Sequence, residues 1–281
     1  MTTNAPRPID LQHAGRPHVI SAWQVGDIIV DPGPASCLGA LFDGLGDSEP
    51  RVLALTHIHL DHAGATGSLV RRFPKLEVWV HERGARHLID PSRLLASAGR
   101  LYGADMERLW GEVIPVPAEN VRSLSGGERV GPFSVAYTPG HASHHVSYLD
   151  ESSGDAFTGD VTGVRIDDGP VLAPTPPPDI DIDLWQASLD TIEAWAPGRL
   201  HLTHFGMRSD VPAHLTLIRE ALRRQARWAE TLDERGFTER MLAPLTSRGD
   251  PVTAAAYEQG LPPGQSYQGL RRYLERPPHD R

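Results

Sequence analysis

The chain has 281 residues, 40% of them hydrophobic and 22% charged, which is typical of a folded protein and excludes disorder over most of its length. Its 27 basic and 36 acidic residues give a formal net charge of −9, the wrong sign for wrapping polyanions, so neither nucleic acid nor an anionic membrane is expected as a partner. A single cysteine, Cys37, excludes an intrachain disulfide and a thiolate zinc finger, and the lack of a long apolar stretch or a signal-peptide pattern predicts a cytoplasmic protein.

The first half of the chain is predicted to alternate strands with helices. Short strands at residues 18–23 and 27–31 form a hairpin that closes on Asp31-Pro32-Gly33-Pro34, where two prolines and a glycine must end the sheet. Residues 51–56 are a continuous apolar run, which indicates a strand buried on both faces, and this run leads into a histidine-rich loop. The elements expected next are a helix at 68–73, a strand at 76–80 and helices at 82–89 and 91–110.

The second half begins with a meander of short strands and ends in helices. The expected strands are 121–124, 129–130, 133–138, 146–149 and 155–158, separated by glycine-rich turns. A loop rich in proline and aspartate, residues 167–181, precedes a helix at 182–195 and a final strand at 199–203. The chain from about residue 212 is helical in pattern, with breaks near 248–251 and 262–264.

Histidines are clustered at three places in the sequence. Eight of the 14 fall in these clusters: His57, His59 and His62; His141, His144 and His145; His201 and His204. His57 and His59 lie two apart where a predicted strand ends, so their side chains point the same way and can hold one metal ion. Asp61 and His62 lie past the turn and face a neighbouring point, where a second ion would sit roughly 3.5 to 4 Å from the first.

The ligand types narrow the choice of metal without fixing it. Imidazole nitrogen and carboxylate oxygen, with no sulfur, suit zinc, iron or manganese. Zn²⁺ is the expected ion, with Fe and Mn as the alternatives.

These motifs resemble those of the metallo-β-lactamase superfamily. Its His-x-His-x-Asp-His motif is complete here as His57, His59, Asp61 and His62. Its later motifs match 138–141 (Thr-Pro-Gly-His), 157–160 (Phe-Thr-Gly-Asp) and 202–206 (Leu-Thr-His-Phe-Gly), in the family's order, and Asp31-Pro32-Gly33 matches its early Asp-x-Gly turn. The resemblance covers roughly residues 18–210.

The resemblance implies an α/β fold, a four-layer αββα sandwich, with a two-metal site at one edge. By the family's pattern His57, His59 and His141 bind the first ion, Asp61, His62 and His204 bind the second, and Asp160 bridges them. The implied domains are an N-terminal tail at 1–17, a catalytic domain at 18–210 and a helical C-terminal extension at 211–281.

Residues beside these motifs have both functional and structural interpretations. Asp31 either hydrogen-bonds a metal ligand or serves only its turn. The glyoxalase II-like branch has the motif Thr-Pro-Gly-His-x-Pro-Gly-His, which this chain resembles from residue 138. His145 matches the second histidine, but Ser143 and His144 stand where the motif has Pro-Gly. We expect His145 to support the site and His144 to line the pocket, while Arg165 is either a substrate contact or a solvated loop residue. His201, three residues before His204 on a strand, should face the other side.

The expected activity is metal-dependent hydrolysis of a small-molecule ester, thioester or lactone by a metal-bridging hydroxide, with Asp61 orienting the water. Two alternatives stay open. One is an oxidoreductase similar to the mononuclear-iron persulfide dioxygenases, with iron on His57, His141 and Asp160; the other is a non-catalytic binding protein. We expect the helical extension to shape substrate entry or a homodimer contact.

Overall fold

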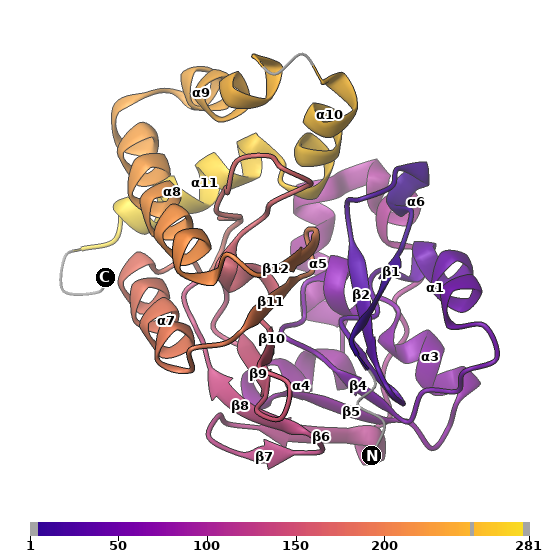
Figure 1. Cartoon of the computed structure of the whole chain (residues 1–281). Helices are drawn as coiled ribbons and strands as arrows, with labels where there is room; N and C mark the ends of the chain where they lie inside the picture. Colours follow the sequence, from indigo (N-terminus) through magenta and orange to yellow (C-terminus); the bar gives the residue numbers. More distant parts are fainter. Residues whose placement is uncertain (1–4, 248–249, 278–281) are drawn as a thin grey trace.

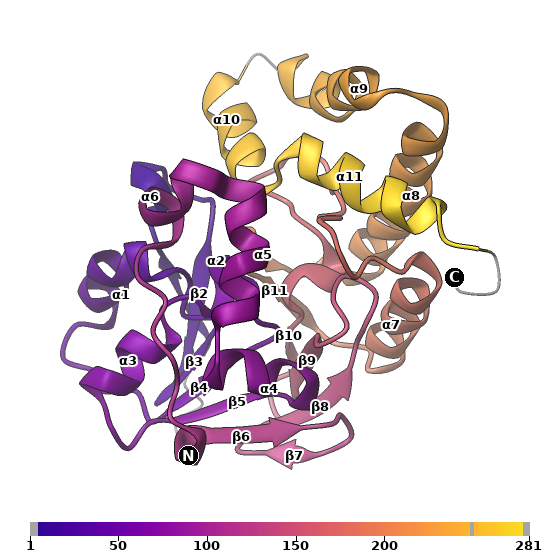
Figure 2. The ribbon, with the colours of Figure 1, turned by 180° about the vertical axis from the view of Figure 1, so that it is seen from behind.

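The computed structural model describes residues 5–247 and 250–277, and these residues form two six-stranded sheets in a four-layer α/β sandwich (Figures 1 and 2). The first sheet has the order β1 (Arg7–Asp10), β2 (Ser21–Val25), β3 (Ile28–Val30), β4 (Val52–Ala54), β5 (Glu77–His81) and β6 (Val121–Leu124). The second has the order β12 (Gly206–Arg208), β11 (Arg199–Leu202), β10 (Asp155–Phe157), β9 (Val146–Asp150), β8 (Phe133–Tyr137) and β7 (Arg129–Val130).

Helices cover the outer face of each sheet, as Figures 1 and 2 show from opposite sides. On the first sheet lie α1 (Leu38–Leu45), α2 (Leu60–Ala63), α3 (Thr66–Arg72), α4 (Glu82–Ile89), α5 (Ser92–Tyr102) and α6 (Met106–Trp110). On the second lie α7 (Ile182–Ala194) and α8 (Val211–Thr231), and the chain then forms α9 (Glu234–Thr246), α10 (Pro251–Gly260) and α11 (Pro263–Leu274). Among the described residues, no helix is both long and apolar enough to cross a bilayer.

Successive side chains of a strand point to opposite faces of its sheet, so one strand contributes both to the core under the helices and to the core between the sheets. In β4, Leu53 packs toward the helices whereas Ala54 packs between the sheets, and both are fully buried. The core between the sheets is aromatic, with Trp23 and Phe157 packed edge to face. The buried strand predicted at 51–56 is therefore confirmed at β4.

Two hydrogen bonds cross from one sheet to the other through this core. The Trp23 indole on β2 donates to the carbonyl of Leu202 at 3.0 Å, and the Tyr148 hydroxyl on β9 donates to the carbonyl of Leu55 at 2.8 Å. Both polar groups are buried, so each bond satisfies atoms that water cannot reach. The two sheets are thus joined by directional contacts as well as by apolar packing.

Most predicted elements are confirmed, and the differences are few. The segment predicted as a tail contains β1, which pairs antiparallel with β2 at the edge of the first sheet. The helix predicted over residues 91–110 is interrupted at Gly103, whose φ of +50° lies outside the helical region, and continues as α6. β12, α1 and α2 were not predicted. The division into a catalytic domain and a helical extension stays a prediction.

The C-terminal helices pack against the sandwich rather than projecting from it. The break predicted at 248–251 lies partly outside the described residues, since α9 ends at Thr246 and α10 begins at Pro251. The Gln259 side chain on α10 donates to the His13 carbonyl at 2.7 Å and accepts from Arg16 at 3.0 Å. The homodimer contact expected of this region stays a prediction.

Candidate metal centre

The polar motifs follow strands that end at one edge of the sandwich. β3 and β4 are parallel neighbours in the first sheet, and β8, β10 and β11 share one direction in the second. Their carboxyl ends therefore meet, which is where α/β folds hold functional groups. The residues that follow them are Asp31 after β3, His57 to His62 after β4, His141 after β8, Asp160 after β10 and His204 after β11.

The turn before His141 depends on a glycine. Gly140 has a φ of +124°, and a Cβ atom there would lie 2.4 Å from the backbone nitrogen of Trp185 on α7. Its carbonyl accepts from the Asp181 amide at 2.9 Å, at the start of that helix. The Pro-Gly-His sequence thus brings the loop into direct contact with α7 and fixes where the imidazole points.

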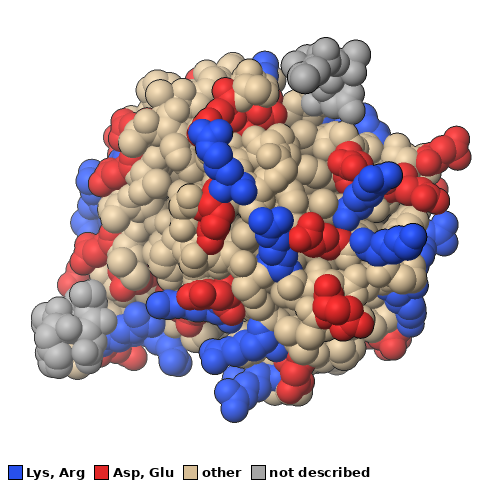
Figure 3. All heavy atoms as spheres, turned by 90° about the horizontal axis from the view of Figure 1, so that it is seen from below, with Lys and Arg blue, Asp and Glu red and all other residues tan. Residues whose placement is uncertain are grey.

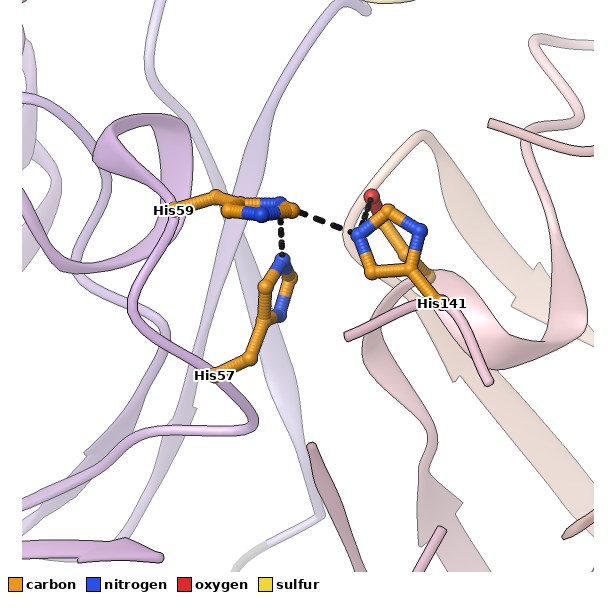
Figure 4. Close-up of side chains that lie close together, drawn as sticks. His57, His59 and His141 are labelled. Atoms are coloured by element: carbon orange, nitrogen blue, oxygen red, sulfur yellow. Dashed lines mark hydrogen bonds and ion pairs between the residues drawn. The ribbon is translucent and has the colours of Figure 1, made fainter. Parts of the chain in front are cut away.

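The first group of ligand-type atoms comes from three histidines and an aspartate (Figure 4). His57 Nε2 and His141 Nε2 each lie 3.0 Å from His59 Nδ1. Asp160 Oδ2 lies 3.3 Å from His141 Nε2. One atom from each of the four residues lies within 4.8 Å of the others, so together they can surround one cation.

A second group lies beside the first. His204 Nε2 is 3.3 Å from Asp61 Oδ2, and His62 Nε2 is 3.8 Å from the same oxygen. Asp160 Oδ1 lies 3.3 Å from His62 Nε2, so the two oxygens of Asp160 face one group each. The structure brings together all seven residues that the resemblance assigns to metal ions, in the same two sets.

Backbone carbonyls hold two of the imidazoles by their outer nitrogens. His141 Nδ1 donates to the Pro174 carbonyl at 2.8 Å, and His204 Nδ1 donates to the Val19 carbonyl at 2.7 Å. Because a carbonyl only accepts, these bonds place the proton on Nδ1 and leave a lone pair on Nε2, which faces the centre.

The inner atoms of the second group face one another without a well-formed hydrogen bond. His62 Nε2 and His204 Nε2 lie 3.3 Å and 3.7 Å from Asp160 Oδ1, and all three atoms are buried without a hydrogen bond of normal geometry to any described residue. Buried polar atoms are normally satisfied, and a cation held between these three would satisfy them. Nitrogen and oxygen donors in this arrangement fit a pair of divalent metal ions.

Charge pairing between the groups shifts the protonation of the metal-free site. Burial alone would lower the pKa of His62, but the carboxylates of Asp160 and Asp61 outweigh it and hold that pKa well above its ordinary value. Burial lowers the pKa of His57 well below its ordinary range and that of His141 to about 4. Protons on the second group thus neutralise two carboxylates where cations would otherwise do so.

Asp31 ties the centre to both sheets. The carboxylate is buried and accepts from the Thr56 amide at 2.8 Å, the Thr56 hydroxyl at 2.7 Å and the Thr203 hydroxyl at 3.1 Å. It also lies 2.8 Å from His62 Nδ1. Of the two interpretations of Asp31, the structure supports the one in which it orients a candidate ligand. Sequence reasoning missed Thr56 and Thr203, although both directly precede motif histidines.

The other neighbouring residues have different positions. His145 is buried with Nδ1 2.9 Å from the Thr138 hydroxyl and its ring stacked on His57, and His144 lines the cavity described below. Arg165 does not line that cavity, because its side chain pairs with Asp210 at 3.0 Å. A direct substrate contact by Arg165 is therefore not supported.

His201 faces away from the centre. Its Nε2 lies 2.8 Å from Asp155, and its ring packs against Trp23 and Phe157 in the core between the sheets. The alternation argument for His201 is thus confirmed.

A cavity of about 850 Å³ opens above the two groups and exposes His59, Asp61 and Asp160 at its floor. Its walls come from α4 and α5 on one side and from the proline loop on the other, and residues 260–266 of the C-terminal helices close it. The Tyr102 hydroxyl on α5 donates to the Gln265 side chain on α11 at 3.2 Å. The helical extension thus lines the candidate site, as we expected, although no sequence motif indicated which of its residues do so.

Comparison with known proteins gives one family. Residues 21–204 match the profile of the metallo-beta-lactamase superfamily. The metallo-beta-lactamase fold-containing protein ST1585 of Sulfurisphaera tokodaii is 31% identical over 169 residues, which are 56% of this chain and 61% of that protein. The hydroxyacylglutathione hydrolase GloC of Haemophilus influenzae is 30% identical over 140 residues, 47% of this chain and 59% of that enzyme. The matches thus span about three fifths of these relatives' own lengths.

Solved structures agree with this fold. The crystal structure of ST1585 from Sulfolobus tokodaii superposes with a TM-score of 0.71 over 95% of this chain and 98% of that one, at 22% identity. The structure of TTHA1623 in a di-iron-bound form gives a TM-score of 0.55 over 71% of this chain and 93% of that one, at 27% identity.

Proposed function

Because the chain belongs to the metallo-beta-lactamase superfamily, we propose that it is a hydrolase that uses two divalent metal ions to cleave a small-molecule ester, thioester or lactone. The observation that carries this proposal is the convergence of two ligand groups, whose buried inner atoms lack well-formed hydrogen bonds, beside one cavity. In the proposed arrangement His57, His59 and His141 hold one ion, and Asp61, His62 and His204 hold the other. Asp160 offers one oxygen to each.

The protein's own residues position the reaction. Divalent ions bound at such sites lower the pKa of water and stabilise negative charge on a carbonyl oxygen. The side chain of Asp61 is 21% exposed and lies in the cavity floor, so a free carboxylate oxygen can accept a proton from water there. Asp31 fixes the ring of His62, and the apolar cavity walls exclude bulk water around the substrate.

The substrate class rests on the relatives. The hydroxyacylglutathione hydrolases of Haemophilus influenzae and Legionella pneumophila, at 30% and 28% identity, support hydrolysis of a small acyl compound. Zinc is the ion we propose, and the di-iron form of TTHA1623 makes iron the main alternative.

Two other functions are less well supported. An enzyme with a single iron on His57, His141 and Asp160 would need no second set of ligands, yet Asp61, His62 and His204 form one. A non-catalytic binding protein would not require seven clustered ligand-type side chains, three of which line a cavity.

Elemental analysis of protein purified without added metal, followed by ester, thioester and lactone assays, tests the proposal. We expect about two zinc or manganese ions, or two irons, per chain and turnover by the loaded protein. Asp160→Asn should lose bound metal and reduce kcat/KM by at least about a hundredfold, because both ions lose a charged ligand. Asp27→Asn, at an exposed aspartate, is the matched control. One iron per chain would favour the oxidative alternative, and no metal would favour a binding role.

A further inference from the structure

One wall of the cavity is rich in positive charge. Arg83, Arg86 and His87 on α4 and Arg93 at the start of α5 all line it. Within residues 5–247 and 250–277, none of the three arginines forms an ion pair with a carboxylate, and each is exposed at the cavity mouth. An arginine that lines a cavity without a carboxylate partner is available to a ligand.

This wall lies apart from the ligand groups, and His144 lies between the two. The ring of His144 stacks on that of His57 at 6.1 Å and meets that of His59 at 5.7 Å. His144 in turn packs against α4, since a Cβ atom at Gly84 would lie 3.5 Å from the His144 Cβ atom. From the floor outward, the cavity therefore presents the ligand groups, then His144, then His87 with the arginines.

The electrostatic environment of His87 indicates a positive potential on this wall. Partial burial lowers the pKa of His87, and the charges of Arg86 and Arg93 lower it further, which together outweigh the carboxylates of Asp179 and Asp90 that raise it. Arg86 Nε also donates to His87 Nε2 at 3.2 Å, which requires a neutral acceptor nitrogen. An imidazole kept neutral beside two guanidinium groups can donate its remaining N–H to an anion.

The carboxylates of the cavity do not cancel this charge. Apart from the candidate metal ligands, Glu82 and Asp179 are the carboxylates among the described lining residues, against three arginines. Asp179 accepts from the Ser143 hydroxyl at 2.6 Å and keeps its charge, so the three arginines exceed the two carboxylates by one. The outer part of the cavity thus carries net positive charge in addition to any metal ions at its floor.

Apolar side chains also line the cavity. Leu94 and Leu101 of α5 face the cavity from one side, and Pro176, Pro177 and Pro178 face it from the other. Such walls suit a hydrocarbon segment, since burying it removes apolar area from water at no polar cost.

We propose that this cavity selects acyl substrates that carry a remote anionic group, a carboxylate or a phosphate, bound by Arg86 and Arg93 while the scissile carbonyl lies over the ligand groups. This inference rests on the proposed hydrolase function. It specifies in addition that the substrate is anionic and which residues bind its charged group. The bond broken is the acyl C–O or C–S bond; water supplies OH to the acyl carbon and H to the leaving group. The remote anion takes no part in this step.

Three para-nitrophenyl esters with straight acyl chains of equal length test this inference on the metal-loaded protein. Their far ends are a carboxylate, a phosphonate and a neutral carboxamide, in a chain too long for the end group to attack its own ester. We expect kcat/KM at least about tenfold higher for an anionic ester than for the carboxamide. The better of the two anionic esters identifies the source of the charge.

The variants Arg86→Gln and Arg93→Gln, separately and together, locate the effect. In the double variant we expect kcat/KM for the preferred anionic ester to fall roughly 10-fold to 100-fold, chiefly through KM, with the carboxamide ester unchanged. Arg100→Gln, at an exposed arginine of α5 that does not line the cavity, is the matched control. Metal content per chain should be the same in all variants.

The outcomes separate this inference from the hydrolase proposal. If the three esters are cleaved equally, or the double variant keeps the preference for the anionic ester, then Arg86 and Arg93 do not bind the anionic group. The hydrolase proposal is then unaffected. If none is cleaved, the hydrolase proposal fails for acyl esters. Binding of the corresponding ethers, measured by calorimetry, then tests whether Arg86 and Arg93 bind the anionic group. Weaker binding of the anionic ether to the double variant supports this, whereas equal binding overturns it.

Discussion

Asp31 orients residues of the candidate metal centre although it is not itself a candidate ligand. Its backbone adopts a φ of +49°, a conformation that aspartate tolerates better than most residues, in the turn that ends β3. The carboxylate then contacts Thr56 beside His57, Thr203 beside His204, and His62 itself. A single negative charge therefore aligns groups from three separate motifs.

Replacing Asp31 by asparagine should weaken metal binding without removing a proposed ligand. The amide keeps the size of the carboxylate but accepts fewer hydrogen bonds, so His62 and Thr56 lose their fixed orientation. We expect a decrease in metal affinity of about 10-fold to 100-fold, measured by competition with a chelator. Asp27→Asn, in an exposed turn, should leave the affinity unchanged; equal affinities for both variants would show that Asp31 serves only its turn.

His214 should make the stability of the fold depend on pH. It is fully buried on α8, donates to the Thr162 carbonyl at 2.8 Å, and burial lowers its pKa to about 4. The unfolded chain, with a histidine pKa near 6.5, binds this proton first as pH falls, so the free energy of unfolding decreases from about pH 6.5 down to pH 4.

The variant His214→Gln keeps a donor for Thr162 but does not titrate. Its free energy of unfolding, from urea titrations at several pH values, should change less than that of the unmodified protein between pH 4 and 6.5, by up to about 3 kcal/mol. Parallel curves would show that His214 accepts a proton in the folded state. His18→Gln, at an exposed site, controls for general effects of the substitution.

At the scale of single residues, the sequence predicts the candidate metal ligands better than the groups that orient them. His57 and His59 could be paired from spacing alone, and the resemblance supplied Asp160 and His204. The carbonyls of Val19 and Pro174, which orient two of the rings, have no side-chain signature. They are supplied by loops whose paths depend on the whole fold.

The proline loop and α11 act as one structural element on the cavity wall. The Thr175 hydroxyl donates to the Ser266 carbonyl at 3.0 Å, and Arg276 donates to the Pro178 carbonyl at 3.0 Å. At Gly269, a Cβ atom would lie 2.0 Å from the Thr175 carbonyl oxygen. The loop therefore keeps its shape because a helix distant in sequence leaves room for its backbone.

A methyl group at position 269 should disturb this contact. In Gly269→Ala we expect a loss of about 1–3 kcal/mol in the free energy of unfolding from overpacking, because backbone rather than a flexible side chain must move. KM should rise as the cavity wall shifts. Gly99→Ala, at a helical glycine of α5 with nothing within 4 Å, should instead stabilise by roughly 0.5–1 kcal/mol. Similar urea curves for the two variants would contradict the close contact at Gly269.

Elements were predictable where their own residues determine them. The apolar runs of β4 and β5 and the proline and glycine breaks specify strands locally. β1 and β12 were missed because each is short and is defined mainly by the strand it pairs with, β2 and β11 respectively. The walls of the cavity depend on packing between α5, the proline loop and α11, which no local pattern encodes.

At the scale of the whole molecule, the candidate centre lies where the two sheets meet. His57 to His62 follow a strand of the first sheet, whereas His141, Asp160 and His204 follow strands of the second. Away from this edge, the face in Figure 3 carries interspersed basic and acidic side chains rather than a field of one sign. This pattern agrees with a small-molecule substrate, which stays a proposal.

Removing bound metal should therefore destabilise the protein as a whole. Ions held only by the folded state, at a free concentration a hundred times the dissociation constant, add about 2.7 kcal/mol. We expect a chelator to lower Tm by roughly 5–10 °C and re-addition of zinc to restore it, measured by calorimetry. Asp160→Asn should show a smaller shift; a Tm independent of chelator would contradict metal ions that join the sheets.

The two hydrogen bonds between the sheets end at Leu55 and Leu202, each two residues before a candidate ligand, His57 or His204. A change at Trp23 or Tyr148 would therefore move a histidine that neither residue touches. During divergence of such a sequence, selection on the chemistry would also act on these aromatic residues, and surviving replacements would have to arrive in compensating pairs. Neutral drift in the core would then be slow at these positions, although they contact no substrate.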